Sequence, residues 1–247
     1  MKKLLSIISI GFIIASCGKA NVYTSDFSTA VFINASPGSP ILSVYVDTIS
    51  QVTVAFKSTS GYLSVKPGTR NIQLKNSTNL TVNNVNSPSE TFATNTAYTY
   101  FVYDTITATT NNLKTLRLSD QFTLPAAGSI KVRVLPLAIK QSAVDITFLR
   151  TSATPNDSVT LSNLSYVGAS PAQATIDALS AFTTIPAGAY SVKVKTAGTQ
   201  TVLVTGTYTL ANLTGSGNTY GINTFYLAGT AMGQALSLNV FRNHPYP

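Results

Sequence analysis

The segment Ile185-Pro186-Ala187-Gly188-Ala189-Tyr190-Ser191-Val192-Lys193-Val194-Lys195 decides the fold of this chain. Its apolar residues Tyr190, Val192 and Val194 alternate with polar neighbours, which places them on one side of an extended strand. A Pro-Ala-Gly turn precedes them, and β-branched and aromatic residues favour such a pleated surface. The same alternation recurs at Val52/Val54/Phe56, Ile72/Leu74, Ile130/Val132/Val134 and Leu236/Leu238/Val240. The sequence therefore predicts an all-β protein whose strands have one buried and one solvent-facing side.

Two features qualify this pattern. The charges Lys131 and Arg133, like Lys193 and Lys195, fall on the solvent-facing sides of their strands, where charge protects sheet edges. Only the segment Ala169–Ala181 has a composition that could hold a turn or two of helix. We therefore expect four solvated charges and one short helix.

The chain also repeats itself. Four segments of the first half have counterparts in the second: Ser43–Asp47 with Asp145–Leu149, Leu63–Lys75 with Thr183–Lys195, Ala97–Tyr100 with Thr219–Ile222, and Leu116–Leu118 with Leu236–Leu238. Extra sequence lies between Arg150 and Ala178 of the second copy. The repeated order predicts two tandem β-sandwich domains, residues 28–122 and 129–247, joined by a linker at 123–128. A single barrel is the alternative.

The N-terminus predicts a location. Lys2 and Lys3 precede an apolar run, Leu4–Ile14, that is too short to span a bilayer, and Ile14-Ala15-Ser16 leads into Cys17. This pattern resembles a bacterial lipoprotein signal, which implies that residues 1–16 are removed, that Cys17 is acylated, and that residues 17–27 form a lipidated tether. An ordinary secretory peptide is the alternative. Gly18 favours the outer membrane, with the cell surface preferred over the periplasmic face.

Composition limits the partners. Cys17 is the one cysteine, so a lipidated chain has no disulfide, and the fold must be stabilised by packing. The net charge of +8 becomes +6 without Lys2 and Lys3, and the basic residues are spread along a chain that contains no tryptophan. Because nucleic-acid binding needs a clustered basic stripe, we expect no nucleic-acid partner.

Several motifs point to a family. Phe32-Ile33-Asn34-Ala35-Ser36-Pro37, Val44-Tyr45-Val46-Asp47, Gly61–Gly68 and Ala97-Tyr98-Thr99 resemble a widespread family of secreted bacterial domains of unknown function. Ile185–Val192 supplies the clearest motif of the second copy, which has Val134-Leu135-Pro136 in place of Asn-Ala-Ser-Pro. The resemblance implies immunoglobulin- or transthyretin-like sandwiches and brings no established activity. Together with the N-terminus, it is most similar to cell-envelope lipoproteins of the Bacteroidota.

Residues for catalysis or metal binding are sparse. The chain has one histidine, His244, near its end, one glutamate, Glu90, and seven aspartates that are well separated in sequence. No nucleophile elbow, glycine-rich phosphate loop or calcium loop occurs. We therefore predict no catalytic residue, no metal, no cofactor and no enzymatic activity.

Candidate sites remain on turns and loops. Asp47-Thr48-Ile49, Asp104-Thr105-Ile106 and Asp157-Ser158-Val159 each resemble the O-glycosylation signal of Bacteroidota envelope proteins, which makes Thr48, Thr105 and Ser158 candidate acceptors; Asp-hydroxyl turn pairs are the alternative. Two loops could bind ligands on a rigid β scaffold, Asn34–Pro40 in the first copy and the insertion Arg150–Ala178 in the second. Their candidate residues are Asn34, Ser36 and Ser39 in the first copy and Asn156, Asn163 and Tyr166 in the second. Tyr62, Tyr98, Tyr100 and Tyr190 are expected to pack within or across the strands.

Three functions are compatible with these features. The first is a lipid-anchored, non-enzymatic binding or adhesion module for a glycan or for an envelope or host protein. The second is a pilin-like structural subunit, although no arginine lies between Cys17 and Arg70 for the activating cleavage that such pilins use. The third is an accessory lipoprotein of a polysaccharide-uptake complex. The sequence leaves the oligomeric state open.

Overall fold

The computed structural model describes residues 26–76, 89–106, 113–120, 122–151, 157–212 and 221–243. The first eight strands form two four-stranded sheets, ordered β4-β1-β7-β8 and β3-β2-β5-β6. Their bounds are β1 (Ser28–Asn34), β2 (Leu42–Val46), β3 (Ile49–Val54), β4 (Thr59–Val65), β5 (Gly68–Lys75), β6 (Ser89–Phe92), β7 (Ala97–Tyr103) and β8 (Lys114–Asp120). The two sheets enclose one core and make the first sandwich.

The remaining strands form a second sandwich with the same strand order. Its sheets are ordered β12-β9-β15-β16 and β11-β10-β13-β14. The elements are β9 (Ser129–Pro136), β10 (Val144–Arg150), β11 (Ser158–Leu164), α1 (Gln173–Ser180), β12 (Thr183–Pro186), β13 (Gly188–Thr196), β14 (Val202–Leu210), β15 (Ile222–Ala228) and β16 (Ser237–Arg242). The prediction of an all-β protein is confirmed.

The residue pairs of the β-ladders show whether the two halves of the chain correspond as their sequences predict. Val44 pairs with Leu74 in the first sandwich, and Ile146 pairs with Val194 in the second, as the comparison requires. Ala30 and Val132 likewise correspond, because they pair with Leu63 and Thr183.

The comparison is wrong by three residues in the last two strands. The parallel ladders pair Ala30 with Tyr98 and Val132 with Asn223, so Tyr98 corresponds to Asn223 and not to Tyr220. On the adjacent strand, Leu118 corresponds to Phe241 and not to Leu238, because they pair with the equivalent residues Thr99 and Thr224. The similarity of the aromatic and leucine residues indicates a false register, because the connection between β14 and β15 is longer than the connection between β6 and β7.

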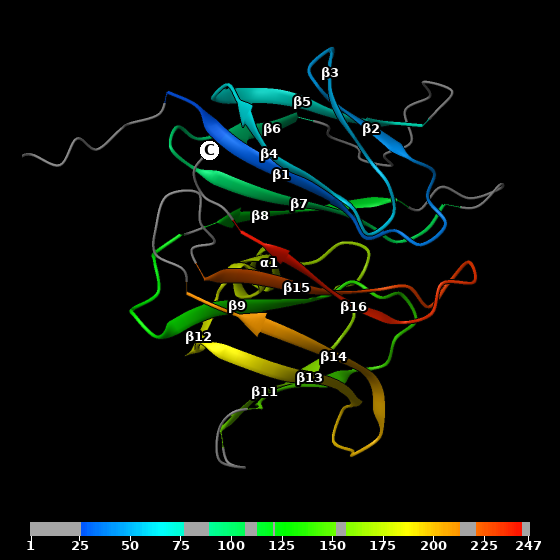
Figure 1. Ribbon diagram of the computed structural model, residues 1–247. Coiled ribbons are helices and arrows are strands. Elements are labelled where there is room, and N and C mark those ends of the chain that lie inside the picture. Colours follow the sequence, from blue (N-terminus) through cyan, green and yellow to red (C-terminus); the bar gives the residue numbers. More distant parts are fainter. Residues whose placement is uncertain are drawn as a thin grey trace, which may run out of the picture.

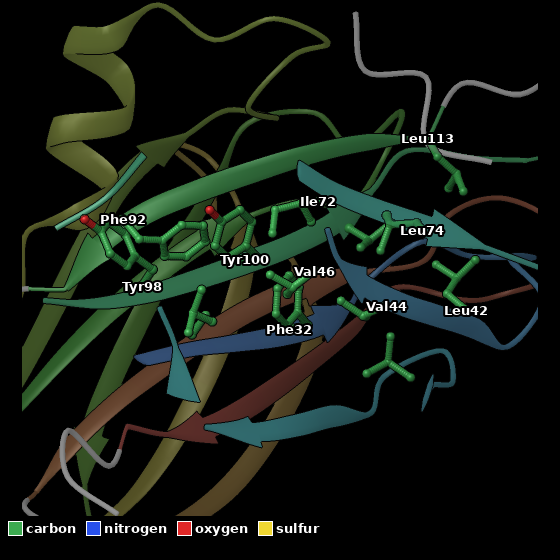
Figure 2. Packing of buried hydrophobic residues seen from close by; sticks show 14 residues of the cluster. Phe32, Leu42, Val44, Val46, Ile72, Leu74, Phe92, Tyr98, Tyr100 and Leu113 are labelled. Atoms are coloured by element: carbon green, nitrogen blue, oxygen red, sulfur yellow. The ribbon is translucent and has the colours of Figure 1, made fainter. Parts of the chain in front are cut away.

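The first core shows how the alternation is used. Phe32 and Tyr100 stack with ring centroids 4.9 Å apart, and Phe92 meets the rings of both Tyr98 and Tyr100 (Figure 2). Leu42, Val44 and Leu74 from the opposite sheet close the cluster, as Figure 2 shows. Tyr98, Tyr100 and Tyr190 are buried, which confirms the prediction that they are packing residues.

The two sandwiches pack against each other and give four sheet layers (Figure 1). The inner layers are β4-β1-β7-β8 and β12-β9-β15-β16, whose facing sides share one apolar cluster. Within it, Phe101 and Tyr226, which occupy equivalent positions, meet edge to face at 5.3 Å. β7 and β15 are consequently buried along their whole length, so the expectation of one solvent-facing side fails for these inner strands.

The burial of Arg133 is a second consequence of this packing. Arg133 is only 2% exposed, so the prediction that it is a solvated charge is wrong. The alternation correctly put Arg133 on the side of β9 opposite the second core. That side faces the first sandwich rather than water.

The predicted helix is present as α1, within Ala169–Ala181. It belongs to the β11–β12 connection, residues 165–182, whereas the equivalent β3–β4 connection in the first sandwich comprises only residues 55–58. Ile176 and Leu179 pack against the shared cluster between the sandwiches. Within the described residues, no helix has the length and apolar character needed to cross a membrane.

Candidate functional site

A groove of about 500 Å³ lies between β8 and α1. Four consecutive residues of β8, Lys114–Arg117, line it together with Ser119. Successive strand residues point to opposite faces of a sheet, so a hollow that all of them touch runs along the strand's edge. β8 is indeed the edge strand of its sheet, with β7 as its strand neighbour.

The opposite wall is one face of α1. Gln173, Ile176, Asp177 and Ser180 line the groove, with the spacing of three and four residues that a single helical face requires. The Gln173 amide donates to the Asp177 carboxylate at 2.8 Å, which keeps both polar groups on this face. The helix therefore contributes a polar wall of amide, carboxylate and hydroxyl groups.

Charges of both signs surround the groove. Arg117 and Glu90 form an ion pair at 2.8 Å, and Arg117 also donates to the carbonyl oxygen of Thr91. Burial raises the pKa of the Glu90 carboxyl, and the nearby Arg117 charge opposes that shift. Lys114 lines the groove without an ion pair to any described carboxylate. The site is thus close to balanced in charge, unlike a polyanion-binding site.

A second hollow of about 390 Å³ extends the groove toward the second sandwich. Ser119, Asp177 and Ser180 line both hollows, and Lys131 and Phe182 close the far end. The combined groove therefore touches strands of both sandwiches and exists only while they are packed together.

A buried polar cluster fixes that packing. Arg133 of β9 forms an ion pair with Asp120 of β8 at 2.7 Å, and both side chains are at most 1% exposed. The guanidinium also donates to Thr224 at 2.8 Å and to Thr99 at 3.0 Å. Its face lies 4.6 Å from the ring centre of Phe182. Because each of the three guanidinium nitrogens has an ion-pair or hydrogen-bond contact, the cluster favours one relative position of the sandwiches.

Further polar contacts join the sandwiches, among them a hydrogen bond at 3.3 Å from the Tyr226 hydroxyl to the carbonyl oxygen of Lys57. The Asn243 amide donates to the Tyr62 hydroxyl at 3.1 Å and accepts from Thr224 at 2.6 Å. The Tyr103 hydroxyl donates at 3.1 Å to the carbonyl oxygen of Gly168, in the segment that leads to α1. The bond from Tyr103 to Gly168 ties the segment before α1 directly to the first sandwich.

The first predicted binding loop is held by its own polar residues. Asn34 and Ser36 have no exposed area. The Asn34 side chain donates to Ser39 at 2.8 Å and accepts from the Ser36 backbone, while the Ser36 hydroxyl donates to the carbonyl oxygen of Asp104 at 2.6 Å. Asn34 and Ser36 therefore shape this loop and do not present their side chains to a ligand, which corrects that prediction. Ser39 is half-buried.

The candidate residues of the second predicted loop differ in their exposure. Asn163 is exposed at φ 55°, and its backbone N–H donates to Asp145 at 2.8 Å. Tyr166 is half-buried, with its ring 6.4 Å from that of Tyr103, and burial raises the pKa of its hydroxyl. Asn156 lies outside the described residues. Asn163 and Tyr166 do not line the groove.

The candidate modification sites differ in exposure. Thr48 is exposed in the two-residue turn between β2 and β3, and Ser158 is exposed at the start of edge strand β11. Thr105 is half-buried, and its hydroxyl lies 3.4 Å from the Asp104 carboxylate. Cys17 and His244 lie outside the described residues, as do the predicted signal and most of the tether.

The described residues contain no group of three or more His, Cys, Asp or Glu side chains that could hold a metal ion. In the groove, Glu90 is paired with Arg117, and Asp177 stands on the opposite wall. The arrangement offers hydrogen-bond donors and acceptors along an elongated surface, which suits binding.

The sequence marked the insertion between Arg150 and Ala178 as a candidate binding loop, but it did not single out the individual groove residues. The extra sequence between Arg150 and Ala178 and the short helix were both signals for it, because an insertion into one copy of a repeat marks a local difference. The sequence does not reveal that this helix packs along β8 of the other sandwich.

The architecture defines the class, a protein of two packed β-sandwiches with the same strand order. A domain described as "Domain of unknown function (DUF4397)" covers residues 28–147. The match begins at the first residue of β1 and ends within β10, and it includes the first-copy motifs that resemble a secreted domain family. No curated protein matches the chain.

Proposed function

We propose that this chain is a lipid-anchored, non-enzymatic binding module of a bacterial cell envelope that engages a glycan or a protein. The groove between β8 and α1 carries this proposal. It combines an edge strand, a polar helical face and residues of both sandwiches.

The pseudo-symmetry of the fold supports this choice of site. The first sandwich replaces the α1 connection with the short segment 55–58, so the helix is an addition to a repeated scaffold. A helix that only stabilised its own sandwich would pack on that sandwich's core. Instead, α1 packs at the junction of both sandwiches, and none of its residues is buried.

The N-terminal anchor belongs to the same proposal. Acylated Cys17 would hold the chain on the outer membrane, and bacterial lipoproteins carry enough acyl chains for firm retention. The tether Gly18–Phe27 spans roughly 35 Å when extended, which leaves the sandwiches room to meet a ligand in water. Exposed Thr48 and Ser158 would then be accessible for O-glycosylation.

Protease shaving of intact cells tests the location. An antibody against the second sandwich follows the protein with and without cell lysis, and a periplasmic protein serves as the lysis control. Digestion of intact cells is the expected result. Protection until lysis would contradict the surface assignment and direct the search to envelope partners.

Adherence tests the binding role. Cells that carry the wild-type protein should adhere better than cells that carry Ser119→Trp, which fills the groove, to at least one immobilised polysaccharide or matrix protein. Ser162→Trp is the matched control, because Ser162 is an exposed residue of the edge strand β11 and does not line the groove. Equal adherence of wild type and Ser119→Trp to every surface would argue against the proposal.

A further inference from the structure

We propose that the linker 123–128, together with Phe27, is a membrane-contact surface that lies in the headgroup region of a phospholipid bilayer. The inference rests on the proposed lipid anchor at Cys17. It adds that one defined end of the protein faces the membrane and that the opposite end faces away from it.

The linker is an exposed apolar segment. Leu124-Pro125-Ala126-Ala127-Gly128 is a run of five residues without a polar side chain. Leu124 is 60% exposed, and Ala126 and Ala127 are exposed as well. Single exposed apolar residues are common on proteins, but neighbouring ones that form a continuous surface are typical of protein or membrane contacts.

Two carbonyl groups of the linker are already paired within the protein. The Ala126 carbonyl accepts hydrogen bonds from the Ser129 N–H at 3.0 Å and from the Asn212 side chain at 2.9 Å. The Gly128 carbonyl accepts from the Ala187 N–H at 2.8 Å. Polar main-chain groups near lipid are costly when they lack partners, so this pairing favours an interfacial position of the linker.

The linker lies at the end of the molecule where the N-terminal segment enters the fold. β8 ends at Asp120, which pairs with Ala97 of β7, and Ala97 pairs with Thr29 near the start of β1. Phe27, which precedes β1, therefore lies at the same end as the linker, on the left of Figure 1. Because Phe27 is 45% exposed, two separate segments contribute apolar surface to this end.

The position of Cys17 in the chain indicates a bilayer as the partner. The segment 18–25 separates Cys17 from the described residues, and it spans roughly 30 Å when extended. An acyl chain on Cys17 would therefore hold this end of the protein close to the membrane, where the linker and Phe27 could contact it.

Charges near this end favour anionic headgroups. Lys66 follows β4, whose last residue pairs with the first residue of β1, and Arg242 lies beside the start of β15. Lys131 comes shortly after the linker, and none of the three forms an ion pair with a described carboxylate. They outnumber Asp26 and Asp177, the carboxylates without an ion pair in the same region. Basic side chains beside an apolar surface attract anionic lipids.

The absence of tryptophan from the sequence allows a direct test, because an introduced tryptophan is then the only one. Leu124→Trp and Ala127→Trp place it in the linker. Ile41→Trp is the matched control, because Ile41 is 58% exposed and follows the opposite end of β1, about 20 Å along that strand. The full-length acylated proteins are extracted from bacterial membranes and reconstituted into phosphatidylethanolamine–phosphatidylglycerol vesicles, with and without brominated acyl chains.

In vesicles, the emission of both linker variants should shift to shorter wavelength, and brominated lipid should quench it. Ile41→Trp should emit as in water and resist quenching. Each variant is also combined with Cys17→Ser and measured in buffer without lipid. There the linker tryptophans should emit like exposed ones, because Leu124 and Ala127 are exposed in the protein. Unfolding midpoints equal to that of the wild type show that the variants fold.

The outcomes separate the inference from the lipid anchor. If the wild type floats with the vesicles but the linker tryptophans resemble Ile41→Trp, the membrane-contact surface is wrong and the anchor stands. A shifted emission in buffer would also overturn the inference alone, because the chain itself or a second copy would then cover the linker. If the wild type does not float with the vesicles, the proposed anchor fails and the inference fails with it.

Discussion

Replacement of Arg133 by methionine tests the central feature of the fold, the buried contact between the sandwiches. Methionine keeps much of the side-chain volume but removes the ion pair with Asp120 and the hydrogen bonds to Thr99 and Thr224. It also removes the cation above the Phe182 ring. The Asp120 carboxylate then remains buried with only a hydroxyl partner.

The expected cost follows from the burial of both partners. Removing one member of a buried ion pair costs about 3–5 kcal/mol, because the other charge is left uncompensated. For a chain of this size, each kcal/mol lowers the melting temperature by about 2–4 °C. Arg133→Met should therefore lower it by roughly 6–20 °C.

Urea unfolding followed by circular dichroism, together with calorimetry, measures this loss. The control is Arg70→Met, whose ion pair with Asp47 is longer, at 3.5 Å, and partly exposed, so its loss should cost less than about 1 kcal/mol. The double variant Arg133→Met/Asp120→Leu should recover most of the stability, since it leaves no unpaired charge. A cost for Arg133→Met as small as that of the control would refute the reasoning.

Three further outcomes are expected. Phe148→Ala should destabilise the protein by about 3–5 kcal/mol in urea unfolding, because this fully buried ring packs against Tyr190 and Phe225; a loss below 1 kcal/mol would contradict the observed core. Two backbone N–H groups hold the pKa of the exposed Asp145 carboxyl below its usual range, so its stabilising contribution is present above about pH 3.9 and is lost as the pH falls through the folded-state pKa. The stability difference between wild type and Asp145→Asn should accordingly shrink in acid, and a difference that grows on acidification would show the sign to be wrong. Cys17→Ser should release the protein from membranes in cell fractionation, and unchanged retention would count against lipid anchoring.

The alternation in the sequence predicted the fold class for a direct physical reason. A strand that packs on one core must place apolar residues at every second position, so Tyr190, Val192 and Val194 were readable as core residues without any knowledge of their neighbours. The repeated segments gave the correct correspondence for β2, β4 and β5, whose core-facing residues keep the same two-residue period in both halves. They failed for β7 and β15, where both sides of the strands are buried and the alternation disappears.

The sequence predicted less of the candidate site than of the fold. The insertion was visible, and so was its short helix, but the groove needs β8 from one half and α1 from the other. The polar character of Asn34 and Ser36 suggests ligand contacts, and the same property lets these residues hydrogen-bond within their own loop. Polarity alone does not distinguish a residue that binds a ligand from one that satisfies its own backbone.

The sequence by itself determined the strands, the inward-facing residues of each core, the one short helix and the order of the repeated turns. These are local properties, set by the period of the side chains and by turn residues close in the chain. Only the tertiary structure decided that the two sandwiches pack face to face, that Arg133 is buried against Asp120, and that α1 lies along β8. Those features depend on surfaces of different elements that meet only in the folded chain. A charged residue on the outer side of a strand has the same sequence pattern whether water or a second sheet lies beyond it.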